Sequence, residues 1–243
     1  LYSKLCTQNS VLKTLYSKLK RMSITQNLQR ITAQLPDGVK LVAVSKFHPV
    51  EKIMEAYDAG QRVFGENRAQ EMAAKAPQLP TDIQWHFIGH LQKNKVRMIM
   101  PWASTIQSID SIELLQLVNK EAARINRHIN VLLQLHVAKE QTKSGFTIDE
   151  VLKAADDGAF KDLSNVTIAG VMAMATFTDD MEQVASEFEQ VHDTFLTLRD
   201  NHFAGDPVFK EISMGMSDDW RIAVKHGATL VRIGTDIFGA REY

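Results

Sequence analysis

The chain has 243 residues, 44% of them hydrophobic, with 28 Lys and Arg against 29 Asp and Glu and a formal net charge of -1. This length suits one large α/β domain or two small ones with a sizeable core. The balanced charge argues against nucleic acid as a partner. Cys6 is the single cysteine, which excludes a disulfide framework, and no apolar run is long enough to cross a bilayer. We therefore expect a cytoplasmic protein without membrane contacts.

The N-terminal segment differs in charge from the rest of the chain. Residues 1–21 hold five basic and no acidic side chains, and the first acidic residue is Asp37. Three interpretations are open: a basic targeting segment, a disordered arm, or sequence read through ahead of a true start at Met22. We favour the last, because Met22 opens a stretch with the pattern of a first helix. The prediction is a basic extension over 1–22, disordered or not native, followed by one domain over 23–243.

Beyond a helix predicted over 23–34, apolar strand-like runs alternate with helical patterns. The predicted strands are 40–45, 62–65, 83–89, 104–109, 129–137, 166–174, 208–213 and 229–234. The helices predicted to follow them are 50–60, 67–76, 91–100, 111–125, 147–158, 181–201, 218–227 and a short one after 234. Eight such units without a linker predict an α/β fold, a single (β/α)8 TIM barrel. An open doubly wound sheet is the alternative, but it usually has a glycine-rich first turn, and none is present.

Lys46 directly follows the first predicted strand, "LVAVS". That strand lacks the alternation of a half-exposed strand, which is typical of strands covered on both faces in a parallel sheet. Barrel chemistry is located where strands end, so Lys46 is predicted to face a semi-buried mouth. Burial disfavours the ammonium form, and a neutral lysine amine can attack a carbonyl carbon.

Arg232 has the corresponding place on the last predicted strand. The two-residue period of a strand puts Lys46 on the same face as Val42 and Val44, and it puts Arg232 on the same face as Leu230. The first and eighth strands are neighbours in a closed barrel, so Lys46 and Arg232 are predicted to point into one mouth. Two cations in one pocket favour an anionic ligand.

Two loops near the end of the chain are candidates for a phosphate site. The segment "SMGMSDDW" at 213–220 carries hydroxyls and a glycine before a helix, with Ser217 as the expected N-cap, and "GTDIFG" at 234–239 opens the last helix. Loops after the seventh and eighth strands often bind phosphate in such barrels. Plain capping and turn formation is the alternative for either loop alone.

No metal site is predicted. His86 and His90 are four residues apart, but "HFIGH" crosses from a strand into a turn through Gly89, so the two imidazoles are not expected to converge. Four methionines at strand ends are expected to pack there or to line an aromatic ligand. They are Met172, Met174, Met214 and Met216.

Six segments together resemble one family. The segments "VAVSKFHP", "FGENRAQE", "WHFIGHLQKNK", "KSGF", "SMGMSDDW" and "VRIGTDIFGAR" are similar to those of the pyridoxal phosphate homeostasis proteins, single-domain relatives of the barrel of bacterial alanine racemase. The resemblance runs from about residue 23 to 243. It implies a barrel that binds pyridoxal 5'-phosphate (PLP), with Lys46 forming the internal aldimine.

The resemblance also implies the other cofactor-binding residues. Ser213, Gly234 and Thr235 would hold the phosphate, and Arg232 would face the pyridine nitrogen. Asn67 and Met172 resemble the neighbours of the ring. The chain departs from the family at Arg68, where relatives often carry tyrosine, and at His90, where proline is common. Both departures affect the rim and concern ligand entry or partner contacts.

The arginine bears on the chemistry. Arg232 stays protonated and donates hydrogen bonds, so it disfavours a proton on the ring nitrogen and makes the ring a poorer electron sink. Racemases of the related fold also use arginine, but they take a second base from a separate β domain, which we expect to be absent here. The resemblance therefore implies a monomer that carries or buffers PLP in vitamin B6 and amino-acid homeostasis, without turnover. PLP-dependent apoenzymes are its expected recipients.

Two alternatives remain open. A slow PLP-dependent racemase or transaminase would use a loop residue or a water as the second base. A class I Schiff-base aldolase would use Lys46 and the phosphate loops without any cofactor. The aldolase would be colourless and would form its imine with a sugar phosphate.

Overall fold

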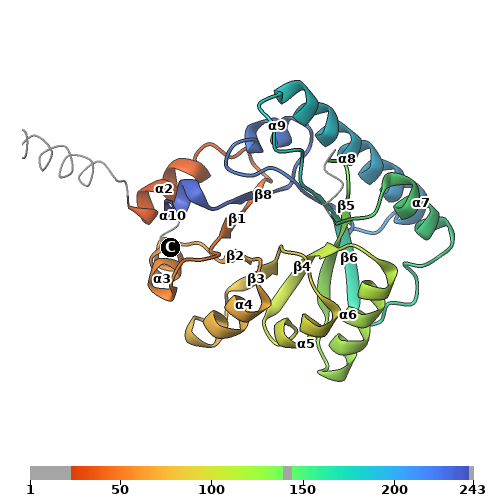
Figure 1. Cartoon of the computed structure of the whole chain (residues 1–243), viewed down its shortest axis with the longest axis horizontal. Helices are drawn as coiled ribbons and strands as arrows, with labels where there is room; N and C mark the ends of the chain where they lie inside the picture. The colour runs from red at the N-terminus through yellow and green to blue at the C-terminus, as the bar shows by residue number, and fades with distance from the viewer. Residues whose placement is uncertain (1–22, 139–143, 241–243) are drawn as a thin grey trace, which may run out of the picture.

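The computed structural model describes residues 23–138 and 144–240. Eight strands follow one another in sequence order around a closed barrel, with β8 paired to β1 (Figure 1). All neighbouring strands are parallel. They are β1 Lys40–Val44, β2 Val63–Glu66, β3 Gln84–Phe87, β4 Ala103–Ile109, β5 Ile129–Leu135, β6 Val166–Ala173, β7 Glu211–Ser213 and β8 Leu230–Ile233. The predicted (β/α)8 barrel is confirmed.

The helices lie around the outside of the barrel (Figure 1). They are α2 Ile24–Thr32, α3 Val50–Asp58, α4 Ala69–Lys75, α5 Val96–Ile99, α6 Ile112–Arg124, α7 Ile148–Asp156, α8 Met181–His202, α9 Trp220–Lys225 and α10 Thr235–Phe238. Two 3-10 turns, η1 Ala76–Gln78 and η2 Lys93–Lys95, extend α4 and precede α5. The predicted extension over 1–22 lies outside the described residues.

Two elements differ from their predicted extents. Strand β7 is shorter than the predicted 208–213, because Phe209 leaves the sheet and stacks on Phe203 and Phe195, with ring centroids 4.1 and 5.1 Å away. The helix predicted over 91–100 begins only at Lys93, because the backbone of Gln92 is extended, and it is divided into η2 and α5 at Lys95, where φ is -102° and ψ is -8°. Neither change alters the order of the units.

Apolar side chains cover both faces of the sheet. Strand β1 is exposed at Lys40 and buried from Leu41 to Val44, which explains its lack of alternation. The larger hydrophobic cluster fills the space between the strands and the outer helices. A second cluster fills the inside of the barrel and contains Val42, Leu132, Ala169, Met172 and Leu230.

The first and last parts of the described chain are held together. Helix α2 begins with a capping box between Ser23 and Gln26, and Asn27 Nδ2 donates to the carbonyl of Ile237 in α10 at 3.0 Å. Strand β1 pairs with β8 from Lys40 to Ala43, so both strands end at the same level. The predicted adjacency of the first and eighth strands is therefore confirmed.

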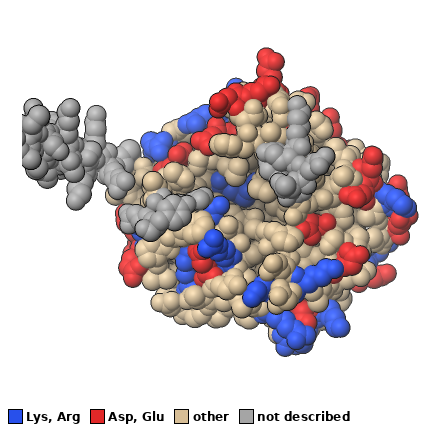
Figure 2. All heavy atoms as spheres, viewed as in Figure 1, with Lys and Arg blue, Asp and Glu red and all other residues tan. Residues whose placement is uncertain are grey.

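The face drawn in Figure 2 carries charged side chains of both signs. On the face drawn in Figure 2, Lys and Arg are interspersed with Asp and Glu, and neither forms a continuous patch. Among the helices of the described ranges, none is both long enough and apolar enough to cross a membrane.

Candidate functional site

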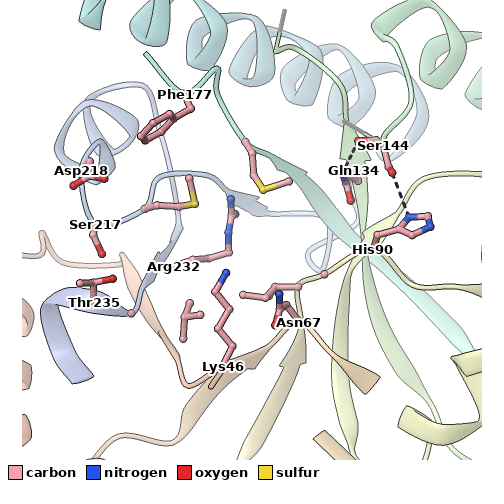
Figure 3. Close-up of a pocket in the computed structure, with 16 residues that line it drawn as sticks. Lys46, Asn67, His90, Gln134, Ser144, Phe177, Ser217, Asp218, Arg232 and Thr235 are labelled. Atoms are coloured by element: carbon pink, nitrogen blue, oxygen red, sulfur yellow. Dashed lines mark hydrogen bonds between the residues drawn. The ribbon is translucent and has the colours of Figure 1, made fainter. Parts of the chain in front are cut away.

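A cavity of about 520 Å³ opens at the carboxyl ends of the strands. Such a volume is ordinary for a site that holds a small molecule. Figure 3 shows Lys46 and Arg232 pointing into it, with Ser217 and Thr235 on one side and His90 on the other. Its position is the one expected for the functional end of a (β/α)8 barrel.

Lys46 reaches the cavity because its backbone follows β1 closely. The preceding residue, Ser45, is fully buried, and its hydroxyl donates to Glu66 Oε1 at 2.7 Å. The ammonium of Lys75 donates to the carbonyl of Ser45 at 3.1 Å. Side chains of β2 and α4 thus hold the segment from which the Lys46 side chain extends into the cavity.

An ionic cluster lies behind this segment. Lys75 Nζ is 2.8 Å from Glu66 Oε1 and 2.9 Å from Glu71 Oε2. Burial raises the pKa of Glu66, although Lys75 and the Ser45 hydroxyl act against the rise. Burial also opposes ionisation of Glu71, but its hydrogen bonds from Lys75 and the Phe47 backbone lower its pKa overall. The cluster therefore depends on Lys75 to compensate two carboxyl groups.

Arg232 enters the same cavity from β8. It is almost fully buried, and its NH1 donates to both the carbonyl and the hydroxyl of Ser213, at 2.8 and 2.7 Å. Its NH2 donates to the carbonyl of Ala173 at 2.8 Å. Burial lowers the pKa of Arg232 to about 10, and Asp219 acts in the opposite direction. The guanidinium is therefore charged and held in place at neutral pH.

Ser217, Gly234 and Thr235 line one end of the cavity. A Cβ added to Gly234 would lie 3.1 Å from the carbonyl oxygen of Val44, so the absence of a side chain keeps β1 and the start of α10 close together. The predicted N-cap role of Ser217 is wrong, because α9 begins later and its N-cap is Asp219. The Ser217 side chain lines the cavity instead.

The structure does not bring two of the predicted residues to the cavity wall. Ser213 is fully buried beneath it, and its hydroxyl donates to Gln107 Oε1 at 2.6 Å. Met172 packs in the apolar cluster inside the barrel. The cavity is lined instead by Ser217, four residues after Ser213, and by Met174, two residues after Met172.

The opposite end of the cavity is polar and partly open. Asn67 lines it, and its Oδ1 is buried without a hydrogen-bond partner among the described residues. His90 Nδ1 lies 3.1 Å from Asp110 Oδ2 and 3.3 Å from Ser144 Oγ. Gln134 and Ser144 were not predicted as site residues, although Gln134 is a polar residue near the carboxyl end of a largely apolar strand, which is a usable signal.

The two histidines do not converge, as predicted. His90 lies at the rim with its side chain 59% exposed. His86 lies inside the barrel, with its Nδ1 2.8 Å from Gln107 Nε2. Burial lowers the pKa of His86 to about 4, and the charge of Lys40 adds to this effect. His86 is therefore a neutral, internal group.

Comparison with known proteins agrees with this geometry. The family described as alanine racemase, N-terminal domain, matches residues 19–242. The pyridoxal phosphate homeostasis protein of Vibrio alginolyticus is 39% identical over 236 residues, covering 91% of this chain and 99% of that protein. The structure of PipY from Synechococcus elongatus without PLP has 36% identity and a TM-score of 0.84, covering 89% of this chain and 100% of PipY.

A second structure of PipY contains bound PLP. It is 35% identical to this chain with a TM-score of 0.81, and again 89% of this chain is covered. Identity at this level over nearly the whole length is far beyond a shared fold alone. The chain therefore belongs to the alanine racemase N-terminal domain family and, within it, to the pyridoxal phosphate homeostasis proteins.

Proposed function

We propose that this chain binds PLP in the cavity at the carboxyl ends of the strands and carries or buffers it in vitamin B6 and amino-acid homeostasis. The observation that carries the proposal is that Lys46 and Arg232 converge on one cavity. One end of that cavity is lined by Ser217, Gly234 and Thr235. When PLP is bound, its aldehyde carbon condenses reversibly with an amine, losing water and giving a Schiff base. The names of the relatives and the PLP-bound PipY structure support the same ligand.

The residues of the cavity fit this group. Lys46 supplies the amine, and the hydroxyls of Ser217 and Thr235 with the backbone around Gly234 suit a phosphate. The buried Oδ1 of Asn67 lacks a partner among the described residues, which suits a polar group of the ligand. Ser213 and Met172 remain part of the proposed site only as residues beneath the cavity, with the Ser213 hydroxyl in contact with Arg232.

Arg232 supports storage rather than turnover. A charged guanidinium donates a hydrogen bond to an unprotonated pyridine nitrogen and disfavours a proton there. An unprotonated ring withdraws electrons less well, so it stabilises a carbanion poorly. The Ser213 and Ala173 contacts hold this donor in place. Together with the names of the relatives, Arg232 therefore makes a slow racemase or transaminase activity a weaker candidate than reversible binding.

We further propose that the protein acts as a monomer in the cytoplasm and releases PLP to PLP-dependent apoenzymes. Light scattering after size-exclusion chromatography will give the mass in solution. Incubation of the PLP-loaded protein with an apoenzyme, followed by the activity of that enzyme, will show transfer. Transfer no faster than from free PLP at the same concentration would overturn the recipient part of the proposal.

The first experiment is a visible absorption spectrum of the purified protein with added PLP, followed by borohydride reduction and peptide mass analysis. Wild-type protein is expected to give a pyridoxyl mass on the peptide that contains Lys46. Lys46→Ala should lose it, and Lys93→Ala, which removes an exposed lysine outside the cavity, should retain it. A colourless, unmodified wild-type protein would overturn the proposal, and an imine with a sugar phosphate would then favour the aldolase.

A further inference from the structure

Four buried polar side chains form a continuous chain through the inside of the barrel. Arg232 NH1 donates to Ser213 Oγ at 2.7 Å, and Ser213 Oγ donates to Gln107 Oε1 at 2.6 Å. Gln107 Nε2 lies 2.8 Å from His86 Nδ1. The exposed fractions are 4% for Arg232, 0% for Ser213 and Gln107, and 7% for His86. These hydrogen bonds link β8 and β7 to β4 and β3 through side chains that are almost completely buried.

With Gln107 Oε1 facing Ser213, as the structure places it, the direction of each hydrogen bond in this series follows. A guanidinium can only donate, so the Ser213 hydroxyl accepts from Arg232 and uses its own hydrogen for Gln107 Oε1. The amide nitrogen of Gln107 then donates to Nδ1 of His86. His86 must therefore be neutral, with its hydrogen on Nε2, and burial lowers its pKa to about 4.

The direction of these hydrogen bonds affects the charge of Arg232, which lies at one end of the series. Each group presents its acceptor toward Arg232, so the aligned dipoles favour the charged guanidinium where burial disfavours it. Apolar side chains such as Val42, Leu132 and Leu230 fill the neighbouring part of the barrel interior, so polar side chains are not needed merely to fill it. Burying polar side chains there costs free energy of desolvation unless each of them forms hydrogen bonds. Its orientation toward Arg232 suggests a role at the cavity rather than filling alone.

We propose that Gln107, acting through Ser213, is a positioning residue that fixes the guanidinium of Arg232 against the ring nitrogen of the bound ligand. The inference rests on the proposed binding of PLP in this cavity. It goes further because neither Gln107 nor His86 lines the cavity. It also gives Ser213 a role on the ring side of the ligand instead of the phosphate side.

The direction of the chain can be tested on the protein without ligand. Nitrogen-15 NMR of the imidazole should show His86 as the neutral tautomer with its hydrogen on Nε2 at pH 7. The opposite tautomer would reverse the Gln107 bond and overturn the proposal. This readout does not depend on PLP binding.

The effect on the ligand is tested with Gln107→Leu and, because that variant can misfold, with Ser213→Ala. Thr105→Val is the matched control, since Thr105 is buried on the same strand and side as Gln107. Gln107→Leu and Ser213→Ala are both expected to bind PLP about tenfold more weakly. In both variants the visible absorption maximum of the adduct that borohydride reduces should shift. Thr105→Val should leave affinity and spectrum close to wild type.

The outcomes separate this inference from the proposed function. A folded Gln107→Leu and Ser213→Ala with the affinity and absorption maximum of Thr105→Val would overturn the inference alone. If Gln107 and Ser213 had a merely structural role, Gln107→Leu and Ser213→Ala would lower the stability of the protein without moving the absorption maximum. Wild-type protein that takes up no PLP would overturn both the proposed function and the inference.

Discussion

Glu71 holds the backbone of Phe47, the residue directly after Lys46. Its Oε2 accepts the N–H of Phe47 at 2.8 Å, and Phe47 has a φ of 67°, in the left-handed region that a side chain disfavours. The guanidinium of Arg68 lies over the Phe47 ring, 4.7 Å from its centroid. These contacts stabilise a strained turn at the base of the Lys46 side chain.

Replacement of Glu71 should loosen this turn. Glu71→Ala removes the acceptor of the Phe47 N–H and one partner of Lys75, with an expected loss of about 2 kcal/mol in the free energy of the local closed state. Hydrogen exchange at the Phe47 amide should become about 30-fold faster. Glu189→Ala, at an exposed position of α8, is the control. Equal exchange rates in the two variants would contradict the role of Glu71.

The buried pair of Glu66 and Lys75 gives a second prediction. Glu66 is fully buried, and the Lys75 side chain is 12% exposed, so Lys75→Met leaves a carboxyl group without its cation. The free energy of unfolding should fall by about 3 to 5 kcal/mol. The double variant Glu66→Gln with Lys75→Met should recover the part of this loss that comes from Glu66, while Glu71 still lacks Lys75, as measured by urea denaturation. Additive losses would argue against a direct coupling.

The buried imidazole of His86 predicts a dependence of stability on pH. Its pKa falls from 6.5 to about 4 on folding, so between these values the unfolded chain binds the extra proton. Stability attributable to His86 is therefore fully present above pH 6.5 and decreases as the pH falls toward 4. From pH 7 to pH 5 the loss is about 2 kcal/mol.

His86→Asn provides the comparison for that prediction. Asparagine keeps an acceptor near Gln107 but does not titrate between pH 5 and 7. Urea denaturation of both proteins at the two pH values isolates the His86 contribution, because Glu66 and the other buried acids are common to both. An identical loss of stability in wild type and variant would show that His86 is not the titrating group.

The sequence was sufficient to predict that Lys46 and Arg232 share a cavity, because strand period and barrel closure are local or topological properties. It was not sufficient to predict the level of each side chain along the barrel axis. Ser213 pairs with Leu230, two residues before Arg232, and so lies one layer below the cavity. That register depends on contacts between strands far apart in sequence. The bond from Ser213 to Gln107 spans 106 residues and has no local signal.

The two serines give the last prediction, which separates the two ends of the ligand. Ser217 lines the cavity beside Gly234 and Thr235, whereas Ser213 contacts Arg232 from below. Pyridoxal has the ring and aldehyde of PLP without the phosphate. Ser217→Ala should therefore weaken binding of PLP about tenfold and leave binding of pyridoxal nearly unchanged, since it removes a hydrogen bond to a charged group.

Ser213→Ala should weaken the binding of PLP and of pyridoxal by the same factor, because both ligands contain the ring nitrogen. Equilibrium titrations of both variants with PLP and with pyridoxal, followed by absorption, measure the two ratios. If Ser213→Ala abolished the preference for PLP over pyridoxal and Ser217→Ala did not, Ser213 would bind the phosphate. The hydroxyl would then have to leave Gln107 and Arg232, which hold it at 2.6 and 2.7 Å.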